Sequence, residues 1–265
     1  MISAARYLHV GKIAARQQWA YRGELMMRSI STILFMGIFV ALWQTAFAAG
    51  DQGELAGYTL IDMVWYLAMT ETVALSSSRI FVDISQSVKQ GDLVYTLMQP
   101  VSYPVVQIVK SLGNSAPRLV LNLLTASLVV FVGTGAIAGS LSGFAAFLVM
   151  AGLSLVLDAV IAVLIGLTAF WLEEVMPIFW IYQKLIFTLG GLFLPLEFFP
   201  SWLQQIAAVL PFRYITNAPA RAFVAFTPAR VLPLLGGQVA YILLFGGLMA
   251  LVWHLAQRRM VIHGG

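Results

Sequence analysis

Four ionisable residues interrupt stretches that are otherwise apolar: Asp62, Glu71, Asp158 and Lys184. In a bilayer each charge would cost about 2.5–3.5 kcal/mol near the midplane, so such residues usually face a cavity or a partner. Lys184 could pair with Asp158 or Glu71, or extend its ammonium group to the nearer interface. The competing explanation is that these groups are buried, paired or protonated and only hold helices together. We treat all four as candidate substrate-path residues.

The longest polar excursion is the stretch 79–104, RIFVDISQSVKQGDLVYTLMQPVSYP. It brings Arg79, Asp83, Lys89 and Asp92 within a few helical turns and ends in prolines, which stop or redirect helices. In a membrane protein, a polar segment of this length must lie in water or against a soluble partner. The stretch is therefore the candidate site of contact with another protein.

Signatures of enzymatic chemistry are missing from the sequence. It has no G-x-x-x-x-G-K-[ST] loop for phosphate binding, no H-E-x-x-H and no G-x-S-x-G elbow. The histidines His9, His254 and His263 lack the spacing of metal ligands, and the chain has no cysteine. We expect no catalytic residue, no metal and no cofactor on this chain.

The composition indicates an integral membrane protein. Of the 265 residues, 60% are hydrophobic and only 10% are charged. A soluble domain usually carries about 25% charged residues. The uncharged run 119–157 is too long for one span, and its glycine-rich part, 133–143, divides it. The expected fold is an all-α membrane protein with six transmembrane helices, at about 29–50, 56–77, 118–137, 144–171, 177–195 and 231–255.

Two further segments flank these spans. Residues 1–28 are predicted to form a basic amphipathic helix in the interface, with Tyr7 and Ala14 on one face and Arg16 roughly opposite. The segment 195–230 is apolar but repeatedly broken by proline. Its helical pieces are too short to cross a bilayer, so we predict an outer re-entrant segment between spans five and six.

Six spans place both termini on one side of the membrane, and the basic residues indicate which side. Of the 15 Lys and Arg residues, eleven fall on the side of the termini and three on the other, while Lys184 lies within a span. Cytoplasmic segments carry the excess of Lys and Arg, so both termini and stretch 79–104 are predicted to be cytoplasmic. The net charge of +4 is thus a topology signal, and no nucleic-acid partner is expected. The basic residues on the outer side are Arg213, Arg221 and Arg230.

Two local patterns stand out. The first consists of Asp83-Ile84, Gly91-Asp92-Leu93, Leu97 and Pro100. The second, after span five, consists of Gly191, Pro195-Leu196, Pro200-Ser201-Trp202, Ile206 and Pro211-Phe212. They resemble the cytoplasmic motif D-I…G-x-L…L-x-x-P and the segment G…P-L…P-x-W…I…P-F of the permease subunits of type-2 ATP-binding-cassette exporters. One position departs from the family, because Gln99 stands where members often carry Arg before the motif proline.

The resemblance covers nearly the whole chain, and it implies one type-2 transmembrane domain over 1–265 with stretch 79–104 as the coupling helix. An ATPase dimer that holds ATP and magnesium would move this helix. A second permease, different but related, would share the path in the plasma (inner) membrane. The substrate would be a hydrophobic or amphiphilic drug, lipophilic cation or lipid leaving the cytoplasm or inner leaflet. The residues implied for ATPase contact are Val82, Asp83, Gln86, Lys89, Gly91 and Asp92, with helix capping by the aspartates as the alternative.

Three other functions compete with this interpretation. A membrane scaffold or assembly protein that transports nothing would have no ATPase partner. An importer permease would carry a cytoplasmic E-A-A…G loop, and Glu173-Glu174-Val175 is not followed by a matching pattern. A proton-coupled carrier would use buried acids directly, but such carriers are usually built from internal repeats, which this sequence lacks.

Overall fold

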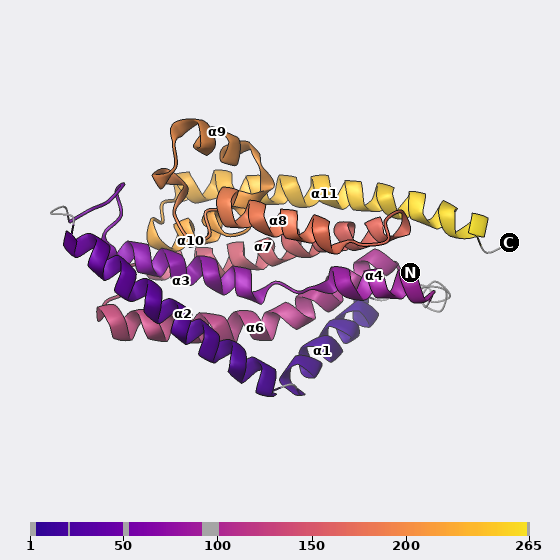
Figure 1. Ribbon diagram of the computed structural model, residues 1–265, viewed down its shortest axis with the longest axis horizontal. Coiled ribbons are helices and arrows are strands. Elements are labelled where there is room, and N and C mark those ends of the chain that lie inside the picture. Colours follow the sequence, from indigo (N-terminus) through magenta and orange to yellow (C-terminus); the bar gives the residue numbers. More distant parts are fainter. Residues whose placement is uncertain (1–3, 21, 50–52, 92–100, 264–265) are drawn as a thin grey trace.

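Helices make up almost the whole of this protein (Figure 1). The computed structural model describes residues 4–20, 22–49, 53–91 and 101–263. Within these ranges a lone bridge joins Leu55 to Tyr58 and no strand forms. The expected all-α fold is therefore confirmed. Asp92, predicted to contact an ATPase, lies outside the described residues.

Four of the described helices contain segments that are long and apolar enough to cross a membrane. The helix of the third expected span begins at Tyr103, earlier than predicted. Pro104 lies in its first turn, where its missing N–H costs nothing, and the helix then continues through Pro117. Part of the stretch predicted to be polar and cytoplasmic is thus the start of a long helix. The four helices are α2 (Arg22–Ala49), α6 (Tyr103–Thr134), α7 (Leu141–Leu167) and α11 (Pro228–His263).

The other two expected spans are shorter than predicted. Helix α3 (Leu60–Ser76) has 17 residues and α8 (Met176–Leu189) has 14. At 1.5 Å per residue these helices reach only about 26 and 21 Å, against a hydrocarbon core of about 30 Å. A capping box between Thr59 and Asp62 sets the start of α3, and Gly191, with a φ of 66°, turns the chain after α8. The six-span count is therefore supported for four helices and remains a prediction for these two.

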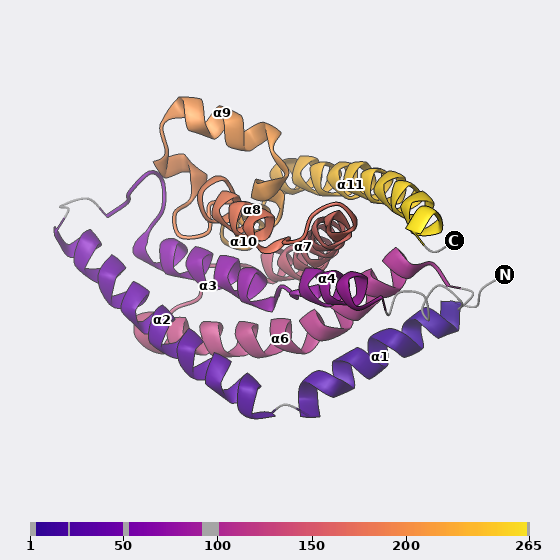
Figure 2. The ribbon, with the colours of Figure 1, turned by 45° about the vertical axis from the view of Figure 1, so that its right-hand side comes forward.

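The chain packs around α3 and α7, which lie at the centre of the bundle (Figure 2). Most of α3 is buried, including Tyr66 and Leu67, and the middle of α7 is buried as well. The remaining long helices lie on the outside and expose many leucine and isoleucine side chains. Such an inside-out distribution is expected where the outer face contacts lipid.

The N-terminal helix α1 (Ala4–Ala20) packs along the first half of α6. Ala14, from the predicted apolar face, is buried beside Gly113 of α6, and Arg16 is exposed, while the interfacial position of α1 stays a prediction. The backbones of α1 and α6 approach so closely that a Cβ added to Gly113 would overlap the carbonyl oxygen of Gly11. Small residues are the usual means of close helix packing in membranes. The side of α1 away from α6 carries the exposed Leu8 and Trp19.

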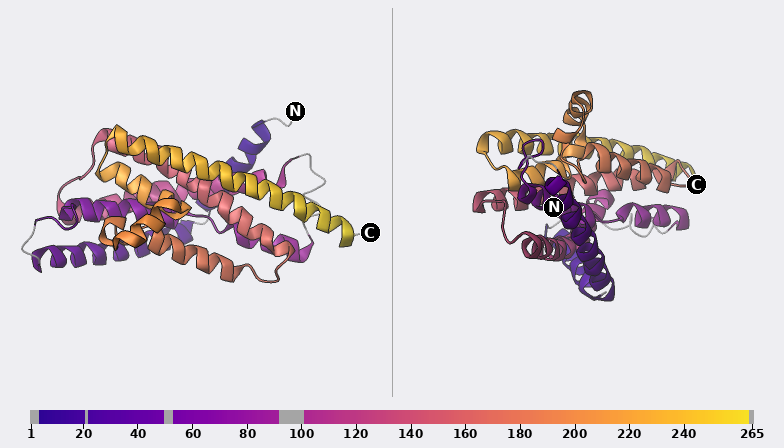
Figure 3. Two further views of the ribbon diagram at one scale, coloured as in Figure 1. Left: turned by 90° about the horizontal axis from the view of Figure 1, so that it is seen from above. Right: turned by 60° about the vertical axis from the view of Figure 1, so that its left-hand side comes forward.

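The proline-broken segment after α8 forms a short arch followed by a buried helix. The arch, residues 196–214, stands away from the bundle (Figure 3). The helix that follows it, residues 217–224, packs between α3 and α7 and buries Asn217, Ala218 and Ala220. Pro200 separates the first two pieces, and Pro211 separates the second from the third. The pieces are η2 (Leu196–Phe198), α9 (Ser201–Val209), η3 (Pro211–Tyr214) and α10 (Asn217–Val224).

A short helix, α4 (Ile80–Gln90), follows α3 at the opposite end of the bundle from α10 (Figure 1). The start of α1 and the end of α11 lie at the same end as α4 (Figure 2). Gly166 of α7 lets α4 pack closely, because a Cβ added there would lie 2.8 Å from Cβ of Ile84. The chain termini and the predicted coupling helix therefore share one end of the molecule.

Candidate functional site

Helix α4 has one buried and one exposed face. Ile80, Phe81 and Ile84 are buried, and the Phe81 ring stacks on Phe179 of α8 with a centroid distance of 4.1 Å. The exposed side carries three of the residues predicted to contact an ATPase: Asp83, Gln86 and Lys89. Val82 is half-buried at the edge between the faces.

The end of α4 is defined by Gly91, whose φ of 75° places it in the left-handed region that favours glycine. The motif glycine therefore closes the helix and is itself exposed. Asp83 lies in the first turn, where its carboxylate complements the helix dipole. Partial burial raises the pKa of Asp83 above its usual value, and the charge of nearby Lys110 acts in the opposite direction.

An ion pair connects α4 to the loop before α8. The Lys89 Nζ lies 2.6 Å from Oε1 of Glu174, and the side chains remain 44% and 70% exposed. Such exposed pairs contribute little to stability, typically about 0–1 kcal/mol. The pair does, however, bring the exposed face of α4 and the α7–α8 loop into one charged surface. We call Asp83, Gln86, Lys89 and Glu174 the docking face.

A lateral groove of about 630 Å³ lies among α2, α3, α6 and α8. Glu71 of α3 lines it and is only 4% exposed. Among the residues that the structure describes, none forms a hydrogen bond or ion pair with the Glu71 carboxylate. The rest of the lining is mainly apolar and aromatic, with Phe35, Phe187 and Phe193 alongside the polar Asn122 and Gln183.

Asp158 lines a smaller cavity of about 150 Å³ beside the groove. Its Oδ1 accepts a hydrogen bond of 2.8 Å from the Tyr182 hydroxyl, and its exposure is 5%. The small cavity also reaches Arg79, the residue before the first turn of α4. The two cavities share four lining residues and are therefore adjacent: Ala74, Leu75, Gln183 and Phe187. Together they run from the start of α4 to Glu71.

The other two candidate path residues lie elsewhere. Asp62 is in the first turn of α3, where its Oδ2 accepts hydrogen bonds from the backbone N–H and hydroxyl of Thr59. Lys184 is exposed on α8, with its Nζ 5.2 Å from the centroid of the Phe187 ring. The structure pairs Asp158 with Tyr182 and records no ion pair of Lys184 with an acid in the described part of the chain.

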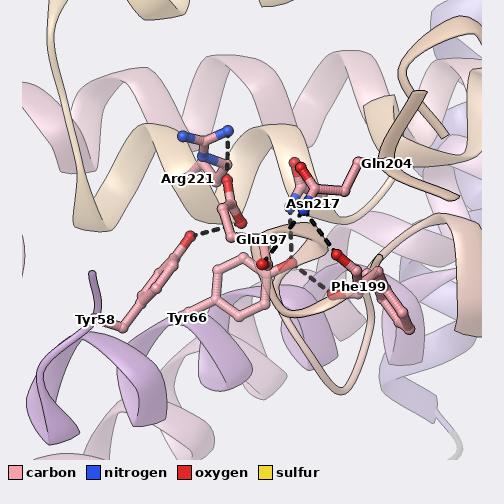
Figure 4. Close-up of polar contacts among 8 residues, drawn as sticks. Tyr58, Tyr66, Glu197, Phe199, Gln204, Asn217 and Arg221 are labelled. Atoms are coloured by element: carbon pink, nitrogen blue, oxygen red, sulfur yellow. Dashed lines mark hydrogen bonds and ion pairs between the residues drawn. The ribbon is translucent and has the colours of Figure 1, made fainter. Parts of the chain in front are cut away.

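A polar network that sequence reasoning missed fixes the segment after α8 to α3 (Figure 4). The Tyr66 hydroxyl donates to the Gly191 carbonyl at 2.5 Å and accepts from Asn217 Nδ2 at 3.0 Å. Nearby, Thr70 donates to the Leu192 carbonyl at 2.8 Å. A tyrosine and two threonines in the apolar part of α3 were the available signal, because buried hydroxyls require partners.

The outer part of this network contains a second ion pair. Arg221 Nη1 lies 2.7 Å from Oε1 of Glu197, and the Tyr58 hydroxyl donates to Oε2 of the same carboxylate at 3.2 Å (Figure 4). Burial, and then the Glu197 charge, raise the pKa of Tyr58 well above its usual value. Tyr58 therefore remains a donor at any physiological pH, and the arch is held to α10 and the start of α3.

The model of a family described as ABC-2 family transporter protein matches residues 31–264. This range contains α4, the small cavity at Asp158, the network around Tyr66 and all of the groove lining except Met27. No curated protein matches the chain.

Proposed function

Because this chain belongs to the ABC-2 transporter family, we propose that it is the membrane subunit of an ATP-driven exporter. The family consists of membrane transport subunits that work with an ATPase on a separate chain. In our proposal the chain lies in the plasma (inner) membrane with both termini in the cytoplasm. A second permease, different but related, completes the path, and the ATPase dimer supplies ATP and magnesium.

The observation that carries this proposal is the docking face on α4. It presents polar side chains on a helix that is held rigidly by Phe81, Ile84 and the close approach at Gly166. A rigid helix transmits a displacement of the ATPase to the bundle, whereas a loose loop would absorb it. We propose that the ATPase contacts Asp83, Gln86 and Lys89. We expect the same contact to include Val82, Gly91 and Asp92.

Two routes lead from the docking face into the bundle. The Lys89–Glu174 pair joins it to the chain that leads into α8. Arg79, at the other end of α4, borders the cavity that holds Asp158. Both routes reach the lateral groove, so a movement of α4 would change the walls of the space in front of Glu71.

The groove favours an amphiphilic cation as the substrate. A buried carboxylate without a partner among the described residues attracts a cation more strongly than water-exposed acids do. The Phe35, Phe187 and Phe193 rings at the groove provide apolar contact and faces for cation–π interaction. Among drug, lipophilic cation and lipid, a lipophilic cation fits the charge and the lining best. Asp158 in the adjoining cavity is proposed as a second part of the path.

The test is purification of the full chain from its native host in mild detergent, followed by mass spectrometry of the associated proteins. We expect an ATPase subunit and a second, related permease. Reconstitution of that complex should give ATP-dependent movement of a lipophilic cation. A chain that purifies alone, or with unrelated proteins, would overturn the exporter proposal in favour of a scaffold.

A further inference from the structure

The three arginines that lie outside the predicted cytoplasmic side line one cavity. Arg213 comes from η3, Arg221 from α10 and Arg230 from the first turn of α11, and they border a cavity of about 300 Å³. This is the end of the bundle opposite α4 (Figure 1). A water molecule occupies about 30 Å³ of liquid, so the space would hold on the order of ten waters or a phosphate group with part of its substituent.

The positive charge in this cavity is only partly compensated. Arg221 is paired with Glu197 at 2.7 Å. The Nε of Arg213 is buried and has no hydrogen-bond acceptor in the described structure, although its guanidinium lies 5.5 Å from the Tyr214 ring centroid. Arg230 is exposed, and no described acid pairs with it. Leaving a buried N–H without an acceptor is unfavourable, and a ligand oxygen would supply the missing acceptor.

We propose that this cavity binds a phosphate group. Guanidinium groups present several N–H donors in a planar fork that fits phosphate oxygens, and three of them line one space here. The rest of the lining is apolar and includes Val231, Pro233 and Leu234. The site therefore fits a phosphate that carries an apolar or neutral substituent.

Two sources could supply such a group: the headgroup of an anionic phospholipid, or a small phosphate solute. Either ligand would be distinct from the substrate of the Glu71 groove, because the charge of the two sites is opposite. Binding at this cavity also requires neither an ATPase nor transport, so it can be measured on the chain alone.

The experiment uses the full chain purified in a non-ionic detergent. Binding of a fluorescent short-chain phosphatidylglycerol is compared with that of the matching diacylglycerol, which lacks the phosphate, and inorganic phosphate serves as the competitor. The test variants are Arg230→Gln, which removes an exposed charge, and Arg213→Gln. Arg258→Gln is the matched control, since it removes an exposed charge at the other end of α11. Thermal unfolding confirms that each variant is folded.

We expect the phosphatidylglycerol to bind at least about tenfold more tightly than the diacylglycerol. Loss of one charge-assisted contact worth about 1.5 kcal/mol weakens binding about tenfold, so each test variant should show that loss and Arg258→Gln should not. Weak competition by inorganic phosphate assigns the site to a lipid headgroup, and full displacement assigns it to a solute. Equal binding of both lipids with no phosphate binding, or unchanged binding in both test variants, would overturn the proposal.

Discussion

The Lys89 Nζ lies 2.6 Å from Oε1 of Glu174, and this ion pair joins α4, the proposed coupling helix, to the loop that leads into α8. Both side chains are largely exposed, so the pair adds little to stability. The pair connects α4 to the chain that leads into α8, one wall of the groove, and we propose that its role is mechanical. An exporter whose α4 moves with an ATPase would need such a connection to the bundle.

Charge reversal at either partner should therefore uncouple transport from ATP hydrolysis. Lys89→Glu or Glu174→Lys places like charges together, and we expect substrate export to fall several-fold. The free energy of unfolding should change by less than about 1 kcal/mol. The double variant Lys89→Glu with Glu174→Lys restores the attraction and should recover export. Export and ATPase activity are measured together in proteoliposomes. If the double variant is as impaired as the singles, Lys89 acts through the ATPase and not through Glu174.

Neutralising Glu71 should change which molecules are carried. Glu71→Gln keeps the size of the side chain and removes the charge from an apolar groove, where charge interactions are poorly screened. We expect transport of a lipophilic cation to fall by about tenfold or more, corresponding to about 1.4 kcal/mol of lost attraction. Transport of a neutral analogue of similar shape should be little changed.

The control for this experiment is Asp62→Asn, which also removes a carboxylate from α3 but lies in the capping box and not in the groove. It should leave the cation preference unchanged. Equal losses for the cation and the neutral analogue in Glu71→Gln would contradict a charge-based role for this residue.

Removing the Tyr182 hydroxyl should destabilise the contact between α7 and α8. Tyr182→Phe leaves the buried Asp158 carboxylate without this donor, which costs about 1–3 kcal/mol. Asp158→Asn keeps an oxygen that can accept the same hydrogen bond, so its loss of stability should be smaller. Thermal unfolding in detergent measures both. Full transport with unchanged substrate preference in Asp158→Asn would remove Asp158 from the substrate path and leave it a packing role.

A methyl group at Gly166 should displace the coupling helix. The added Cβ would lie 2.8 Å from Cβ of Ile84, closer than side chains approach, so α4 must shift on α7. We expect Gly166→Ala to reduce the increase in ATPase activity that substrate causes. The amount of folded protein expressed should fall less. Gly152→Ala, in the same helix but with nothing within 4 Å of the added Cβ, is the matched control and should behave like the wild type. Equal coupling in both variants would argue that α4 tolerates repositioning.

The sequence alone determined the class of protein and pointed to the segment that we propose as the coupling helix. Composition and apolar runs gave an all-α membrane protein, and four of the predicted spans coincide with long apolar helices in the structure. The resemblance to type-2 permeases implied a coupling helix within stretch 79–104, and the structure forms α4 there with Asp83, Gln86 and Lys89 exposed. These properties are local, since each depends on residues within a few turns of one another.

The sequence was less reliable where the chain leaves the regular pattern of spans. It extended α3 by four residues at the start, where the capping box of Thr59 and Asp62 begins the helix. It also started the third span at about Arg118, whereas the helix begins at Tyr103. Apolar composition indicates where a helix can lie in lipid, but caps and initiating prolines decide where the helix begins.

Only the tertiary structure decided which side chains meet. The pairing of Asp158 with Tyr182, the bond between Tyr66 and Asn217, and the gathering of three distant arginines around one cavity join elements far apart in the chain. Such meetings depend on the rotation and relative height of neighbouring helices. The rotation and height of each helix are set by the close packing of small residues and by buried hydroxyl and amide groups that must find partners. No single stretch of sequence contains this information.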